Sequence, residues 1–422
     1  MEALADTLAD PARPSFLFGV TPPREGTSAG KCREICSKFV ARQRALATDG
    51  FIVYDIQDES SRNNEKRPFP FRSLLDPSWY AGLFQAESGK QCLVYKCTPN
   101  TESEEHFMSW LEEANRLHRH RAFNLVGAAS SSQEVKGPSV EESAALLRGY
   151  GKLDASKRCR FGCVTIAERH AQKHREHDNM LRKIGWGAEW FVSQGIYDPD
   201  AMVELINDYA ALCRSRGIVP KKVLLTFVPC GRKKTLQFIK WLGMKIPQHA
   251  EERIFRAAED PTTSPVEMSC QLNRENLIKI LEGTSGCGVP LGLNVESVSG
   301  YRDEIDATHQ LFRDLQCILL DHRGSPWMVR WYDVPRTIGE QHRARGLSMG
   351  SDGDMVAASE SQRQMLQEFQ QMLASAQATV DSARGAQSFQ AGQAALCAFG
   401  GAAVASSVLL AGLFVGLKMG GK

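Results

Sequence analysis

Carboxylates gather where one short apolar run ends, over residues 53–59. Side chains alternate along a strand, so Asp55 and Gln57 share one face of such a run, while Asp58 and Glu59 enter the loop that follows. Like charges crowded in a low dielectric raise one another's pKa, which is the property a general acid needs near neutral pH. Asp55, Asp58 and Glu59 are therefore candidate catalytic acids. The alternative is a solvated acidic loop paired with the basic residues of 62–67.

Three histidines, His170, His174 and His177, fall close together and raise the question of a metal. Zinc takes three or four ligands from a rigid frame, and no cysteine pair at finger spacing lies nearby. We therefore predict no metal site and a polar loop with a helix start instead. The pairs Cys32/Cys36 and Cys159/Cys163 also lack Cys-x-x-Cys spacing, so we expect them to be free thiols.

The elements that position these residues alternate between short β-branched or aromatic runs and longer helical patterns, which favours repeated βα units and a parallel sheet. Eight such units match a closed (β/α)₈ TIM barrel, with a doubly wound open sheet as the alternative. The predicted strands are Phe16–Val20, Phe51–Ile56, Cys92–Cys97, Phe123–Gly127, Gly162–Ile166, Trp190–Gln194, Val223–Val228 and Leu291–Val295. The predicted helices are Lys31–Thr48, Glu104–Leu117, Glu141–Leu147, Asp178–Ile184, Met202–Arg214, Leu236–Leu242 and Glu304–Leu319.

Composition agrees with one large globular domain. The 422 residues are 42% hydrophobic and 24% charged, and the net charge of +2 argues against a general nucleic-acid partner. Twelve cysteines without a disulfide-framework spacing, and an acidic N-terminus without a secretory signal, predict a reducing compartment. We expect the barrel to face the cytosol.

The C-terminal part of the chain does not continue the strand–helix pattern. We assign 1–14 to an N-terminal tail, 15–335 to the barrel, 336–354 to a linker, 355–392 to an amphipathic helix and 393–422 to a C-terminal transmembrane helix. Residues 394–417 carry no charge and are long enough to span a bilayer, which predicts membrane anchoring by the C-terminus without naming the organelle. The small-xxx-small spacing of Gly412 and Gly416 would allow a homodimer.

Four blocks resemble the methylenetetrahydrofolate reductase family, in the family's order. They are Thr21-Pro-Pro-Arg24 after the first strand, Glu168-Arg-His170 after the fifth, Lys183–Asp198 across the sixth unit, and Leu293-Asn294 in the eighth strand. Each block is short, but four in order over a barrel-like pattern make the match more specific. The resemblance covers Phe16 to Asp321.

The resemblance implies a flavin enzyme that reduces 5,10-methylenetetrahydrofolate, or a related pterin, with NAD(P)H in one-carbon metabolism. The protein would position FAD and supply a proton to the folate. By motif position, Gln194 and Asn294 would bind the substrate, while His170 and Lys183 would bind the cofactor.

Departures from the family pattern cluster where chemistry is expected. The family's strand-one glutamate falls on Gly19, and its strand-four Arg-Gly-Asp becomes Val126-Gly127-Ala128. Asp55, one strand away from Gly19, is the preferred replacement acid. Two hypotheses follow: a reductase with a displaced acid, or a catalytically degenerate barrel that serves as a membrane-presented ligand sensor or scaffold.

Overall fold

The computed structural model describes residues 3–44, 46–58, 65–128, 135–152, 154–259 and 263–322. Eight parallel strands pair in sequence order, and the first pairs with the last, so the sheet closes into a barrel. The strands are β1 Phe16–Val20, β2 Gly50–Val53, β3 Cys92–Cys97, β4 Ala122–Val126, β5 Arg160–Thr165, β6 Trp190–Gly195, β7 Lys222–Phe227 and β8 Leu291–Glu296. The predicted (β/α)₈ barrel is confirmed, and the open sheet is excluded because an open sheet has two edge strands, whereas each of these eight strands pairs on both sides.

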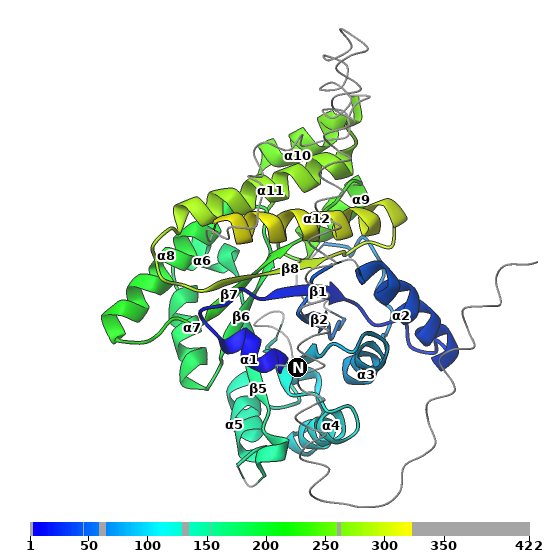
Figure 1. Cartoon of the computed structure of the whole chain (residues 1–422), viewed down its shortest axis with the longest axis vertical. Coiled ribbons are helices and arrows are strands. Elements are labelled where there is room, and N and C mark those ends of the chain that lie inside the picture. Colours follow the sequence, from blue (N-terminus) through cyan, green and yellow to red (C-terminus); the bar gives the residue numbers. More distant parts are fainter. Residues whose placement is uncertain are drawn as a thin grey trace, which may run out of the picture. The chain divides into compact units, whose positions relative to one another are not determined.

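Helices surround the sheet (Figure 1). Their bounds are α1 Leu4–Ala9, α2 Ala29–Gln43, α3 Pro77–Ser88, α4 Glu104–Arg116, α5 Val140–Tyr150, α6 Ala167–Lys173, α7 Glu176–Gly185, α8 Pro199–Arg216, α9 Lys233–Trp241, α10 Gln248–Arg256, α11 Pro265–Gly283 and α12 Arg302–His322. Apolar side chains pack in two layers, one between strands and helices around Phe18, Phe51 and Phe84, the other inside the barrel around Leu17, Leu93 and Trp190.

Five of these helices, α1, α3, α6, α10 and α11, were not predicted from the sequence. The longest, α11, carries a start signal that was available: Ser264 and Glu267 form a capping box, and Pro265 takes the first helical position. For α3, Asp76 caps the first turn and Pro77 follows it. α1, α6, α10 and α11 are additional to one helix per strand, whereas α3 is the single helix between β2 and β3 and fits the alternation.

The segment assigned to an N-terminal tail contains α1, which closes one end of the barrel. Leu4 and Leu8 are buried against the interior layer. The buried Lys222 ammonium, at the start of β7, donates to the Thr7 carbonyl at 2.6 Å. Since Lys222 begins its strand, α1 covers the amino-terminal end, and the opposite, carboxyl end remains for a site.

No helix among the described residues combines the length and apolar character that crossing a bilayer requires. The predicted linker 336–354, amphipathic helix 355–392 and C-terminal anchor 393–422 lie outside those residues.

Candidate functional site at the carboxyl ends of the strands

A cavity of about 620 Å³ opens at the carboxyl ends of the strands. This volume is within the range of small-molecule sites, roughly 300–1,000 Å³. Its polar lining residues are Thr21, Tyr54, Asp55, Arg67, Tyr95, Cys97, Arg169, Arg182, Lys183, Ser193, Gln194, Glu296, Ser297 and Ser299. Barrel enzymes use this same face, so the cavity is the candidate active site.

Strand alternation decides which residues reach the cavity. On β8, Gly292, Asn294 and Glu296 share the inward face, since Leu293 and Val295 belong to the outer apolar layer. On β1 the same rule turns Gly19 inward, two residues after the interior Leu17.

Gly19 and Glu296 are direct neighbours across the β1–β8 ladder. A Cβ atom built on Gly19 would lie 2.8 Å from Cβ of Glu296, 2.8 Å from Cε2 of Tyr54 and 3.0 Å from Oε2 of Glu296. Separations under 3.0 Å are essentially unknown for real Cβ atoms. Glycine at 19 is therefore what allows the Glu296 carboxylate to occupy this part of the cavity.

Glu296 is enclosed by polar side chains. Tyr54 forms a hydrogen bond with its carboxylate, and Nδ2 of Asn294 lies 3.5 Å from Oε2. Asn294 also donates to the Tyr54 hydroxyl at 2.9 Å. Burial raises the pKa of Glu296, while the bonds from Tyr54 and Asn294 act in the opposite direction. A carboxyl group whose pKa is raised is suited to keep a proton and to donate it.

Asp55 lines the cavity just beyond β2, which ends at Val53 and is shorter than predicted. Its Oδ2 accepts from the Cys97 backbone N–H at 2.8 Å, and Gln57 donates to Oδ1. Burial raises the pKa of Asp55, while the Lys96 ammonium opposes that shift. Asp55 is therefore a second buried acid in the cavity, with one oxygen already bonded to the backbone.

The other two acids of the predicted cluster are Asp58 and Glu59. Asp58 is exposed and does not line the cavity, and Glu59 lies outside the described residues. Among the described residues, Asp55 is therefore the one member of the predicted carboxylate cluster that lines the cavity.

Four cationic side chains also line the cavity. Arg169 on α6, Arg182 and Lys183 on α7, and Arg67 from the segment before α3 all line the cavity. The Arg67 guanidinium lies over the rings of Phe71, Phe238 and Trp241 at 4.9–5.4 Å from their centroids. Arg169, Arg182 and Lys183 therefore belong to the helices next to β5 and β6, Arg67 lies beside α9, and the carboxylates of Asp55 and Glu296 come from the ends of β2 and β8.

The residues that the resemblance assigned to substrate lie in or next to the cavity. Gln194, near the end of β6, lines it, and its Nε2 donates to the Leu242 carbonyl at 2.7 Å. Asn294 is buried and is not part of the cavity lining. Its Nδ2 donates to the Tyr54 hydroxyl and, at 3.3 Å, to Oγ1 of Thr226.

The two residues assigned to the cofactor are engaged elsewhere. Lys183 lines the cavity, but its Nζ donates to the Val164 carbonyl at 2.7 Å and lies 3.5 Å from Oε1 of Glu176. His170 is fully buried outside the lining, with Nε2 3.0 Å from Oδ2 of Asp208. His170 therefore lies away from the cavity lining, and the Lys183 ammonium is already engaged with Val164 and Glu176.

Sequence reasoning missed Glu296 and Tyr54. A signal existed for Glu296, because it follows Asn294 by two residues and a strand places such residues on one face. The predicted strand ended at Val295, one residue too early. Tyr54 was noted only as part of its strand.

Comparison with known proteins agrees with this architecture. The methylenetetrahydrofolate reductase family model matches residues 162–285. A solved structure from Clostridium thermocellum, an uncharacterized protein that binds two copies of 5-methyl-5,6,7,8-tetrahydrofolic acid, is 25% identical with a TM-score of 0.60. That likeness covers 72% of this chain and 96% of the other.

More distant likenesses are also found. A type II Baeyer-Villiger monooxygenase component from Pseudomonas putida, in complex with FMN, is 14% identical with a TM-score of 0.39, covering 75% of this chain and 99% of that one. No curated protein matches the chain at a significant level.

Proposed function

Because this barrel is methylenetetrahydrofolate reductase-like, we propose that its cavity binds a reduced folate and that Glu296 supplies the carboxylate that the family carries on its first strand. The observation that carries the proposal is the pair Gly19 and Glu296. The position of the family's acid has lost its side chain, and a carboxylate from the neighbouring strand fills the same space.

The polarity of the cavity supports a folate. A pterin ring presents hydrogen-bond donors that pair with carboxylates, and Asp55 and Glu296 stand on one side. The glutamate tail of a folate is anionic and would pair with Arg169 and Arg182 on the other. Gln194 fits the role of a ring-binding amide between the two poles.

Glu296 would act on a basic nitrogen of the ligand. A carboxyl group with a raised pKa donates a hydrogen bond, or a proton, to that nitrogen, and Tyr54 and Asn294 keep its direction fixed. Asp55 is less available for this step because Cys97 and Gln57 already bond to its oxygens.

The residues present do not fit the flavin role that the resemblance implies. Lys183 and His170 are bonded to protein groups, and the family's strand-four carboxylate and guanidinium are replaced by Val126 and Ala128, which line the cavity. We derive no step through FAD or NAD(P)H.

Reduction of 5,10-methylenetetrahydrofolate with NAD(P)H is a second candidate, favoured by the carboxylate that Glu296 restores. Absorption of bound flavin in the visible region, together with oxidation of NADH or NADPH that depends on the folate, would support it. A colourless protein that binds folate without oxidising either nicotinamide would leave binding as the function.

Calorimetry with 5-methyltetrahydrofolate tests the proposal on the full chain. We expect saturable binding that Gln194→Ala weakens by about 1–3 kcal/mol, because a buried polar group of the ligand loses its partner. Gln248→Ala, an exposed glutamine at the start of α10, is the matched control and should bind as the wild type does. Equal affinity in the wild type and Gln194→Ala removes Gln194 from the site, and absence of binding in the wild type rejects the folate proposal.

A further inference from the structure

Five side chains of the types that can bind metal ions lie close together outside the cavity, where α6 and α7 pack on α8. His170 lies in α6, His174 is its C-terminal cap, and His177 lies in the first turn of α7. Glu204 and Asp208 lie one turn apart on α8 and so share a face. The sequence separates the histidines from these acids by about thirty residues, so only the packing of the helices brings them together.

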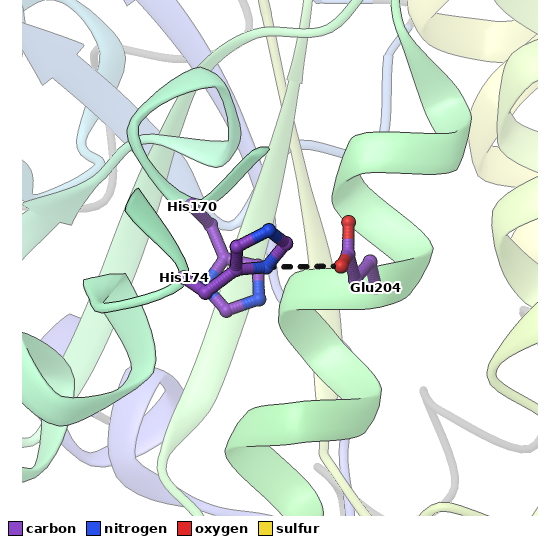
Figure 2. A group of neighbouring side chains, drawn as sticks. All are labelled: His170, His174 and Glu204. Carbon is purple, nitrogen blue, oxygen red and sulfur yellow. Dashed lines mark ion pairs between the residues drawn. The ribbon is translucent and has the colours of Figure 1, made fainter. Parts of the chain in front are cut away.

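The contacts between these side chains are short. Nδ1 of His174 lies 3.2 Å from Oε1 of Glu204, and Nε2 of His170 lies 3.0 Å from Oδ2 of Asp208. Figure 2 shows His170 and His174 on one side and Glu204 reaching toward them from α8. One ligand atom each from His170, His174 and Glu204 lies within 4.8 Å of the others. Four-coordinate zinc needs its ligand atoms roughly 3.3 Å apart, so the exposed His174 and Glu204 have only a small movement to make.

Two buried nitrogens in the cluster lack a hydrogen bond. Nδ1 of His170 and Nδ1 of His177 find no partner among the residues that the structure describes. His170 belongs to both groups of possible ligands in the cluster, since His170, His177 and Asp208 also bring one ligand atom each within 4.8 Å of one another. His170 is fully buried, and its other nitrogen is already bonded to Asp208. Buried polar atoms are almost always satisfied, so an orphaned imidazole nitrogen beside other ligands indicates an absent partner.

We propose that His170, His174 and Glu204 bind a divalent transition-metal ion, with zinc as the expected metal, and that Asp208 orients the His170 ring. A carboxylate bonded to the second nitrogen of a metal-binding histidine is the usual supporting arrangement. Two imidazoles and one carboxylate suit zinc, whereas calcium and magnesium prefer sites made only of oxygen. The exposure of His174 and Glu204 leaves the fourth position to water.

The ion would clamp the α6–α7 pair onto α8. Arg169 on α6, and Arg182 and Lys183 on α7, line the cavity, so the same clamp would fix its cationic wall. The metal is thus a structural support for the cavity, and its presence does not depend on which ligand the cavity binds.

Zinc titration of the full chain after chelator treatment tests the site. We expect one equivalent to bind and to raise the melting temperature by about 2–5 °C. His174→Ala and Glu204→Gln should weaken binding about tenfold or more, and both positions are exposed enough to leave the fold intact. His249→Ala removes an exposed histidine outside the cluster and should change nothing.

Cobalt separates this site from the twelve cysteines of the chain. Nitrogen and oxygen ligands give the visible bands of bound Co²⁺ without the near-ultraviolet charge-transfer band of a thiolate. The proposal would be overturned by a thiolate band in the cobalt spectrum. It would also be overturned if both cluster variants kept the zinc affinity of the wild type, or if the wild type bound no stoichiometric zinc. The proposal would also be overturned if His177→Ala weakened zinc binding while His174→Ala did not, because the ligand set would then be a different one.

Discussion

The carboxylate of Glu296 lies in the space that a side chain at Gly19 would occupy. The two residues face each other across the β1–β8 ladder, and a Cβ atom on Gly19 would come within 2.8 Å of Cβ of Glu296. β1 has no side chain at this point, and the neighbouring β8 places a carboxylate there. This relationship makes the two positions interdependent and leads to the first prediction.

Gly19→Ala should destabilise the protein by about 1–3 kcal/mol, because the new methyl group overlaps Glu296 and Tyr54. Gly19→Glu should be worse, whereas the exchange Gly19→Glu with Glu296→Gly should recover most of the loss by moving the carboxylate back to β1. Urea denaturation measures each step. Gly30→Ala, where a Cβ meets nothing within 4 Å, is the control. If the loss of stability in the double variant equalled the sum of the losses in the two single variants, the two positions would not be interdependent.

Glu296→Gln should stabilise the protein at neutral pH and leave it unchanged in acid. Burial raises the pKa of Glu296 in the folded state, so the folded protein holds this proton more tightly than the unfolded chain. Stability therefore falls as pH rises from the ordinary glutamate range through the raised pKa, and glutamine removes that loss. Thermal unfolding over a pH series measures the difference.

Glu34→Gln is the control, because the pKa of Glu34 is lowered and its replacement should change the stability in the opposite direction. Lys38 and Lys31 lower the pKa of the exposed Glu34 to about 2, so its charge favours the folded state above the ordinary glutamate range. Removing that charge should slightly destabilise the protein at neutral pH. A Glu296→Gln variant that is less stable than the wild type at neutral pH would show that the Glu296 pKa is not raised.

Asp314→Ala should destabilise the protein by about 3–5 kcal/mol. Asp314 on α12 accepts from Arg274 on α11 at 2.6 Å, and both side chains are buried, so the variant strips a buried cation of its carboxylate. The half-exposed Asp306, 3.4 Å from Arg42, is the matched control, and Asp306→Ala should cost under about 1 kcal/mol. Similar losses in the two variants, measured by chemical denaturation, would argue against a buried ionic contact.

Deleting the residues after Gly392 should release the protein from membranes, because the uncharged run at 394–417 is the proposed anchor. Fractionation with alkaline carbonate washing compares the full chain and the truncated chain. Membrane association of the truncated chain, or a freely soluble full chain, would reject the C-terminal anchor and with it the proposal of a barrel that faces the cytosol from a membrane.

The sequence alone determined the barrel. Period-two apolar runs separated by helical segments specify βα units through local geometry, and β1 and β3 begin and end where the pattern predicts. The helices α10 and α11 were not predicted, because they are additional to the single helix expected between β7 and β8. Gln194, named from the family resemblance, and Asp55, named from its place on the second strand, both line the cavity, while their roles stay predictions.

Only the tertiary structure decided which groups meet. Glu296 lies 277 positions after Gly19, yet barrel closure makes them neighbours, and no local pattern records a pairing between the first strand and the last. The histidines of α6 and α7 likewise gained Glu204 and Asp208 only through the packing of α8. His170, which the resemblance assigned to the cofactor, is instead buried against α8, where its Nε2 contacts Asp208. Strand and helix periods act over a few residues, whereas these contacts depend on how the sheet closes and how the helices pack around it.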